Sequence, residues 1–92
     1  MYLEIVSPEA TLFAGEVTSV TVPGINGEFQ MLQNHAPIVS LLQEGDVKVQ
    51  GDITIEEDFQ NKFSKGPNGG TILSISSGTI EMKDNKVIVL AD

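Results

Sequence analysis

The chain has 92 residues with 13 acidic side chains, five lysines and no arginine, for a formal net charge of −8, and it contains no cysteine. The lack of cysteine excludes disulfides, thiolate catalysis and cysteine-ligated zinc. The acidic balance argues against nucleic acid as a partner, because a polyanion is repelled at long range and no basic stripe exists to bind phosphates.

Length and hydropathy limit the class of protein further. A chain of 92 residues is expected to form one domain with a modest core. Glu4 stands where a signal peptide would need basic and apolar residues. No apolar run approaches the roughly 20 residues that a membrane-spanning helix needs. We therefore expect a soluble, cytosolic protein with no direct membrane insertion.

Apolar and polar residues alternate from the start of the chain. Residues 2–5 and 20–22 follow the period of two that is typical of half-buried strands. Val17 is apolar but out of phase with Val20 and Val22, which predicts a β-bulge between them.

The stretch 24-GINGEFQMLQNHAPIV-39 combines turn-forming residues with the only histidine of the chain. A catalytic His35 would need an orienting carboxylate and a nucleophile. Glu28 and Ser40 are the nearby candidates, but their spacing matches no nucleophile motif. One histidine does not make a zinc site, although carboxylates could complete one. We interpret His35 as a loop residue that hydrogen-bonds the backbone or a partner; a small enzyme that uses His35 is the alternative.

The middle of the chain predicts a hairpin followed by a short helix. A three-residue connection at 50–52 would set Val49 against Ile53 and Val47 against Ile55. In 56-EEDFQNKFSK-65 the two phenylalanines are four residues apart, acidic residues lead and lysines follow. A Gly-Pro pair comes next, and this order favours a short helix.

The end of the chain predicts a second hairpin. A two-residue turn at Asp84-Asn85 places Met82 opposite Val87 and Ile80 opposite Val89, which makes one face uniformly apolar. Taken with the frequent Gly and Pro turns, the short strands predict an all-β fold, an antiparallel β-sandwich or barrel.

The segment 81-EMKDNK-86 also suggests a different class of protein. Biotinyl and lipoyl carrier domains are small, acidic and all-β, and they present a modified lysine at the tip of a hairpin. Lys83 is placed somewhat similarly, but the predicted turn makes it a strand-end residue. A carrier domain modified on Lys83 remains the alternative function.

Four segments, which together cover most of the chain, match one known family and occur in the same order as in that family. They are 3-LEIVSPEATLFAGEV-17, 20-VTVPGINGEF-29, 34-NHAPIVSLL-42 and 78-GTIEMKDNKVIVLAD-92. The chain resembles the epsilon subunit of F-type ATP synthases, specifically its N-terminal β-sandwich.

The resemblance implies the architecture and the role of the chain. It implies a single domain over residues 1–92, a flattened antiparallel β-sandwich of about ten short strands with an insertion at about residues 51–70. It implies a non-catalytic subunit of the central rotor stalk, without cofactors, that links the gamma subunit to the membrane c-ring. Such a subunit is peripheral on the cytoplasmic face of the inner (plasma) membrane and supports the coupling of proton or sodium flow to ATP synthesis.

By the same resemblance, specific residues are expected at the interfaces. Glu28 is expected to face the loops of the c-ring and His35 to face gamma, with Asn34, Ala36 and Pro37 in the same contact loop. A fixed Ala-Pro backbone would lower the cost of ordering such a loop on binding.

The chain also departs from the family pattern. Gln30 and Gln33 stand where glycine and proline are common, and Gly78 is flanked by Ser77 and Thr79 where a Gly-Gly pair is common. Long family members continue after a Val-Leu-Ala-Asp-like end into two helices, some of which bind nucleotide or inhibit hydrolysis. This sequence stops at residues 90–92, so we expect a short form without that hairpin, without ATP binding and without inhibition of that kind.

Overall fold

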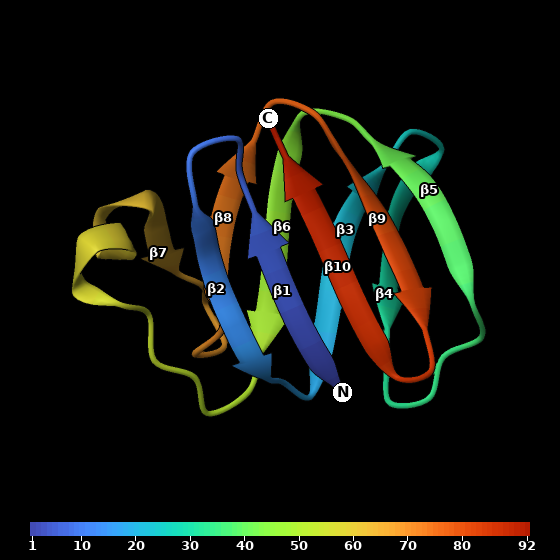
Figure 1. Cartoon of the computed structure of the whole chain (residues 1–92), viewed down its shortest axis with the longest axis horizontal. Coiled ribbons are helices and arrows are strands. Elements are labelled where there is room, and N and C mark those ends of the chain that lie inside the picture. Colours follow the sequence, from blue (N-terminus) through green and yellow to red (C-terminus); the bar gives the residue numbers. More distant parts are fainter.

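The computed structural model describes residues 1–92 and contains ten strands and one short 3₁₀ helix (Figure 1). In chain order the elements are β1 (Tyr2–Val6), β2 (Thr11–Glu16), β3 (Ser19–Gly24), β4 (Gly27–Met31), β5 (Ile38–Leu42), β6 (Gly45–Gln50), η1 (Glu57–Lys62), β7 (Phe63–Lys65), β8 (Thr71–Ile75), β9 (Gly78–Lys83) and β10 (Lys86–Ala91).

The strands form two layers that are joined at one corner. The front layer runs β2-β1-β10-β9-β5, and the back layer runs from β3 through β6 and β8 to β7, with β4 on the other edge of β3 (Figure 1). The layers meet where Gly24 pairs with Leu42. A Cβ atom at Gly24 would lie 2.7 Å from the Phe29 ring, so glycine is needed at this close approach. The result is the predicted flattened β-sandwich.

One strand pair departs from the antiparallel pattern. β1 and β10 are parallel, with Leu3 opposite Val87 and Ile5 opposite Val89, whereas every other pair is antiparallel. Parallel neighbours need a long connection, and here nearly the whole chain lies between the two strands.

The core lies between the two layers and follows the alternation of the sequence. Residues 2–5 and 20–22 point alternately inward and outward, as predicted. Both layers contribute side chains that are essentially inaccessible to solvent. The largest of these are Leu3, Ile5, Val20, Val22, Met31, Val47, Val49, Ile80, Met82, Val87 and Val89.

The C-terminal hairpin forms with the predicted register. Met82 lies opposite Val87 and Ile80 opposite Val89. Asp84 and Asn85 form the two-residue turn, with φ angles of 53° and 61°. These left-handed conformations match a type I′ turn, whose twist suits a hairpin.

The predicted hairpin at 47–55 is wrong. Val47 pairs with Leu73 and Val49 with Thr71 of β8, while the other edge of β6 pairs with β3. Ile53 and Ile55 lie outside any strand and are half-buried against the core. The alternation correctly identified which side chains face inward, but a more distant strand with an equally apolar face occupies the edge of β6.

The predicted bulge at Val17 is also wrong. Val17 is buried in the short link between β2 and β3, so the break in phase marks a change of strand. The register shift lies instead between β1 and β2, where Ile5 faces Phe13 and Val6 faces Thr11. Leu12 is therefore the extra residue of that bulge.

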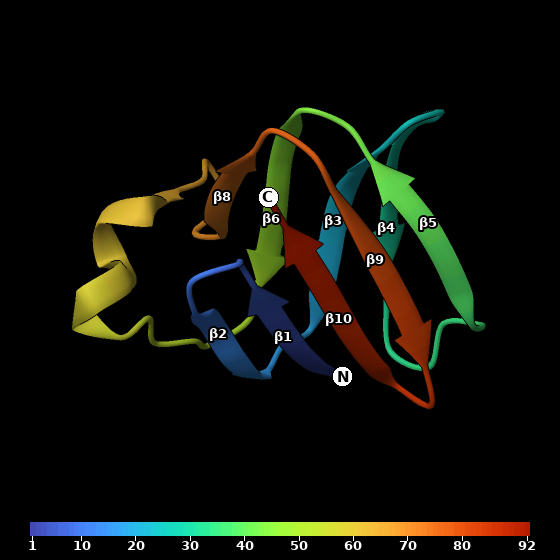
Figure 2. The ribbon, with the colours of Figure 1, turned by 45° about the horizontal axis from the view of Figure 1, so that its top comes forward.

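The 51–70 segment contains a helix that is shorter and tighter than predicted. Residues 57–62 form a 3₁₀ helix, and 63–65 form strand β7, which pairs with β8. Phe59 and Phe63 still pack against the core, as do Ile53 and Ile55. Figure 2 shows this segment at one side of the sandwich, next to β8 and β2.

Val87 tests the inward face of the hairpin. We expect Val87→Asp to unfold the protein, because Val87 is fully buried against the core. Burial of an uncompensated charge costs several kcal/mol, against a total stability of about 5–15 kcal/mol for a small domain. Circular dichroism and thermal melting measure the effect. Leu90→Asp on the exposed face of the same strand is the control, and normal melting of Val87→Asp would contradict the assignment.

Candidate protein-protein interface

The loop of residues 32–37 connects β4 to β5 and is exposed along its whole length. The backbone N–H of His35 donates to the carbonyl of Leu32 at 3.2 Å, which closes a turn. Asn34 sits in that turn with a φ of 59°, a left-handed conformation that asparagine tolerates better than most residues. Four of the five predicted interface residues, Asn34 to Pro37, therefore lie together on one protruding loop.

His35 has no catalytic surroundings. Its Nδ1 lies 2.7 Å from the carbonyl oxygen of Ala36 and donates to it, because a carbonyl only accepts. No ion pair includes His35, and none of the five best-formed surface hollows includes it. Glu28 and Ser40 line one shallow hollow of about 300 Å³ without His35. The predicted bond to the backbone is confirmed, and the three residues do not form a nucleophilic site.

Glu28 is the second residue of β4, next to the β3–β4 turn. This turn and the 32–37 loop lie at opposite ends of β4 (Figure 1). Glu28 Oε2 accepts from Lys48 Nζ of β6 at 3.0 Å, and both side chains are about half exposed, at 52% and 45%. The sequence reasoning missed this pair because Lys48 reaches Glu28 across β3. Beside Glu28, Ile25 at the tip of the turn is 53% exposed.

The strand that follows the loop carries apolar side chains on both faces. Ile38 and Leu42 of β5 point toward the core, while Val39 and Leu41 point outward and are 75% and 59% exposed. We call Val39 and Leu41 the β5 apolar edge. Its signal in the sequence was the nearly continuous apolar run IVSLL, which breaks the alternation expected of a strand with one solvated face.

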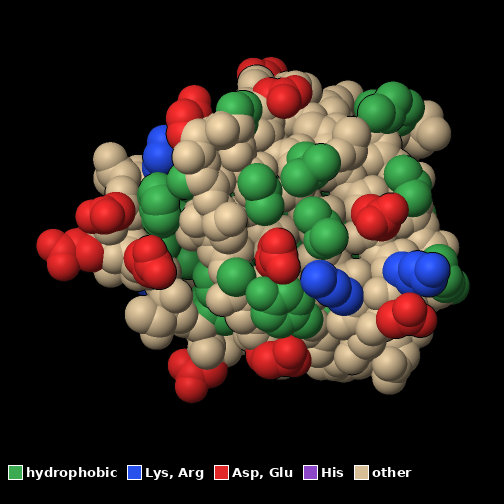
Figure 3. Space-filling model, in the orientation of Figure 1, with side chains coloured by type: hydrophobic (Ala, Val, Ile, Leu, Met, Phe, Trp, Pro, Cys, Tyr) green, Lys and Arg blue, Asp and Glu red, His purple; other side chains and the backbone are tan.

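More apolar surface adjoins the β5 apolar edge on the front layer. Leu41 pairs with Thr79, and Thr79 pairs with Leu90, which is 50% exposed. Figure 3 shows hydrophobic side chains gathered over this face with charged side chains around and between them. Groups of this kind on a soluble domain are typical of contact surfaces.

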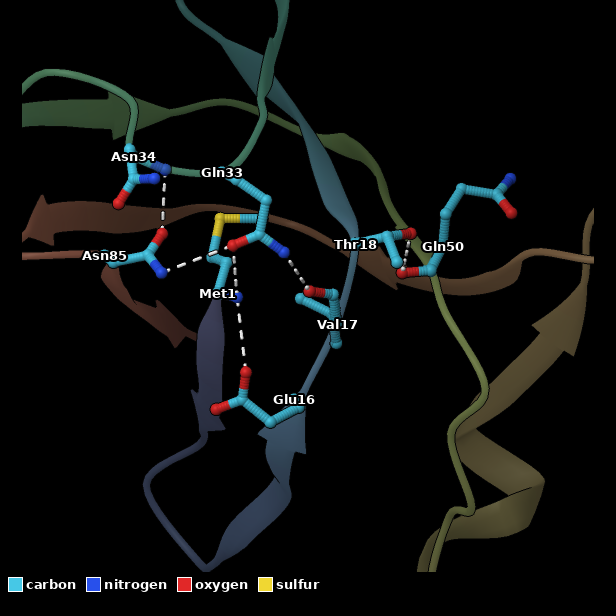
Figure 4. A network of polar contacts seen from close by, with 8 residues as sticks. All are labelled: Met1, Glu16, Val17, Thr18, Gln33, Asn34, Gln50 and Asn85. Atoms are coloured by element: carbon cyan, nitrogen blue, oxygen red, sulfur yellow. Dashed lines mark hydrogen bonds and ion pairs between the residues drawn. The ribbon is translucent and has the colours of Figure 1, made fainter.

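A polar network holds the loop against neighbouring elements (Figure 4). The backbone N–H of Asn34 donates to Asn85 Oδ1 at 2.8 Å, and Asn85 Nδ2 donates to Gln33 Oε1 at 3.3 Å. The same Gln33 oxygen accepts from the ammonium group of Met1 at 2.6 Å, and Gln33 Nε2 donates to the carbonyl of Val17 at 3.4 Å. Met1, Val17 and Asn85, which are far apart in the chain, thus all contact the start of the loop.

Charged side chains meet where β1 and β10 begin. Lys86 Nζ lies 3.8 Å from Glu4 Oε1 and 5.6 Å from the centre of the Tyr2 ring. Partial burial, followed by the carboxylates of Glu4 and Glu16, raises the pKa of the Tyr2 hydroxyl above its ordinary value. The Tyr2 ring lies within reach of the Lys86 ammonium group for a cation–π contact.

Lys83 is the last residue of β9 and lies opposite Lys86, while Asp84 and Asn85 form the tip of the hairpin. The predicted strand-end position is confirmed, and it differs from the tip position of a carrier lysine.

Other kinds of site are not evident. No group of three or more metal-ligating side chains is close enough to hold an ion. Two open hollows, of about 410 and 420 Å³, lie beside the 51–70 segment and near the C-terminal end. No buried side-chain polar atom lacks a hydrogen-bond partner. The only helical element is η1, and no helix has the length and apolar character to cross a bilayer.

The sequence matches known proteins along its whole length. Residues 1–92 match the family model of the ATP synthase delta/epsilon chain, β-sandwich domain. The epsilon chain of Chlorobaculum tepidum is 36% identical over 90 residues, which cover 98% of this chain and 86% of that protein. The epsilon chain of Caulobacter vibrioides is 43% identical over 76 residues, which cover 80% of this chain and 88% of that protein. The epsilon chain of Campylobacter curvus is 37% identical over 92 residues, and this chain spans 60% of its length.

Solved structures share the fold. A chain in the central stalk and c-ring structure of the Tetrahymena thermophila mitochondrial ATP synthase superposes with a TM-score of 0.69 at 14% identity, covering 99% of this chain and 62% of that one. A chain of the Euglena gracilis mitochondrial ATP synthase superposes with a TM-score of 0.72 at 20% identity, covering 97% of this chain and 48% of that one. These structures show the shared fold, while the full-length family match and the similar epsilon chains establish that the chain belongs to the family of ATP synthase delta/epsilon chains.

Proposed function

We propose that this chain is a non-catalytic subunit of the central stalk of an ATP synthase, bound to the gamma subunit on one side and to the c-ring on another. It would lie peripherally on the cytoplasmic face of the inner (plasma) membrane and support the coupling of proton or sodium flow to ATP synthesis. Relatives named as ATP synthase epsilon chains, and a structural neighbour from a central stalk, support this assignment.

The observation that carries the proposal is the β5 apolar edge beside the 32–37 loop. Val39 and Leu41 are largely exposed on a strand whose inner face already packs in the core. Their contact with water is unfavourable in the isolated chain, and a partner that covers them gains the hydrophobic free energy. We assign the gamma contact to this edge together with Asn34, His35, Ala36 and Pro37.

We assign the c-ring contact to the β3–β4 turn, which lies at the other end of β4. Ile25 supplies an exposed apolar tip, and Glu28 supplies a carboxylate that is half exposed despite its bond to Lys48. Two contacts at opposite ends of one strand suit a subunit that links two partners. The same surfaces offer no nucleophile–base arrangement, which supports a role in binding rather than in chemistry.

The gamma contact predicts that Val39→Ser with Leu41→Ser weakens binding to the cognate gamma subunit by about tenfold or more, since full burial of each such side chain is worth about 1.5–3 kcal/mol. Both residues are exposed, so the fold should be preserved. Calorimetric titration against gamma measures the affinity. Ala14→Ser, at an exposed position of β2 on the opposite edge of the front layer, is the control. Equal affinity of the double variant and the original chain would remove β5 from the interface.

The c-ring contact predicts a small, salt-dependent contribution from Glu28. An exposed ion pair between Glu28 and the ring would contribute roughly 0.2–1 kcal/mol and would be screened by salt. Glu28→Gln should therefore weaken binding to the assembled ring by less than about fivefold at low ionic strength. Lys48→Gln frees the Glu28 carboxylate from its internal partner and should have the opposite effect. The affinity of the original chain and of both variants for the assembled ring, measured at two ionic strengths, tests this prediction. If Glu28→Gln changes neither the affinity nor its salt dependence, Glu28 is not at the interface.

A further inference from the structure

The 32–37 loop has no apolar anchor in the rest of the molecule. All six of its residues are exposed, including Leu32 at 55%. The one hydrogen bond within its backbone, from His35 to Leu32, closes a turn but ties the turn to nothing else. The conformation of the loop relative to the sandwich therefore depends on polar contacts from Asn34 and Gln33.

Two of the four contacts are made by the side chain of Asn85, and the other two join Gln33 to Met1 and Val17. Asn85 Oδ1 accepts from the backbone N–H of Asn34, and Asn85 Nδ2 donates to Gln33 Oε1. The orientation of each amide is determined by its partners. A backbone N–H and the ammonium of Met1 only donate, and the carbonyl of Val17 only accepts. Asn85 thus connects the tip of the β9–β10 hairpin to the loop through both ends of one amide.

The residue type at this position is informative. Asn85 is the second residue of a type I′ turn, with a φ of 61°. Glycine is the most favourable residue there, since a left-handed conformation costs a Cβ-bearing residue some stability. The chain instead has asparagine, which tolerates the conformation and supplies a side chain that glycine lacks. The benefit of that side chain lies outside the hairpin, in its two hydrogen bonds toward the loop.

We infer that Asn85 is a positioning residue that fixes the 32–37 loop in the conformation that meets the partner. The inference rests on the proposed function for the role of the loop, while the positioning itself is a property of the isolated chain. A loop that is ordered before binding loses less conformational entropy when it docks. Gln33 extends the same support to the N-terminal residue and to the β2–β3 link.

The variant that tests this is Asn85→Gly. It keeps the turn, and because glycine suits the conformation the melting temperature should stay the same or rise. The loop, however, should become mobile. We expect the backbone ¹⁵N order parameters of residues 32–37 to fall from about 0.85 to below about 0.6. The Asn34 amide should exchange with water roughly two- to tenfold faster, since it loses a single hydrogen bond.

Two further variants separate the loss of the Asn34 hydrogen bond from the loss of the Gln33 hydrogen bond and from the introduction of glycine into the turn. Asn85→Asp keeps an oxygen for the Asn34 amide but loses the donor to Gln33, so the Asn34 amide should stay protected. Asp84→Gly is the matched control. It introduces glycine at the other left-handed position of the same turn, where the Asp84 side chain makes no hydrogen bond or ion pair. It should leave both the loop order parameters and the Asn34 exchange unchanged.

Titration of Asn85→Gly against the gamma subunit distinguishes the inference from the proposed function. A mobile loop with a several-fold loss of affinity supports both. A mobile loop with unchanged affinity supports the positioning role and contradicts the assignment of the loop to the gamma contact. Order parameters and Asn34 exchange that match those of the original chain, or equal loosening by Asp84→Gly, would overturn the inference.

Discussion

The parallel pairing of β1 with β10 is the contact on which the arrangement of the rest depends. It joins the two ends of the chain in the centre of the front layer, with β2 on one side and β9 and β5 on the other. The register that sets Tyr2 opposite Lys86 also brings the tip of the β9–β10 hairpin next to the start of the chain, where the Tyr2 N–H donates to the Asn85 carbonyl at 3.1 Å. The loop between β4 and β5 then has two neighbours to which it can be tied, Met1 and Asn85.

The surface assigned to binding is where the chain departs from the rules that govern its core. A strand with one solvated face should alternate, and β5 does not, because Val39 and Leu41 are apolar and exposed. A type I′ turn should favour glycine, and the second turn position is Asn85. Departures of this kind are expected at functional surfaces, where a residue is retained for what it does toward a partner or a neighbouring segment.

Charge has a different role at each end of the sandwich. At the β3–β4 turn, Glu28 is neutralised within the chain by Lys48, so a partner meets a half-exposed ion pair and not a free carboxylate. At the loop end, the two hydrogen bonds of the Asn85 side chain join uncharged amides, and the Met1 ammonium adds a charged donor to Gln33. These amide contacts are insensitive to ionic strength compared with exposed ion pairs, whose attraction is screened by salt. The contact between Asn85 and the loop is therefore expected to depend less on ionic strength than the contact made by Glu28.

The sequence alone determined the all-β class, the inward face of the strands and the hairpin at Asp84-Asn85, because alternation and turn chemistry act between residues close in the chain. The family resemblance added the sandwich and the contact loop. Only the tertiary structure decided that β8 pairs with β6 in place of residues 53–55, and that Lys48 meets Glu28. It also decided that Asn85 holds Asn34, 51 residues away. Several segments carried an apolar face that could have occupied each strand edge, and the choice among them is made by packing of the whole core, which no local pattern records.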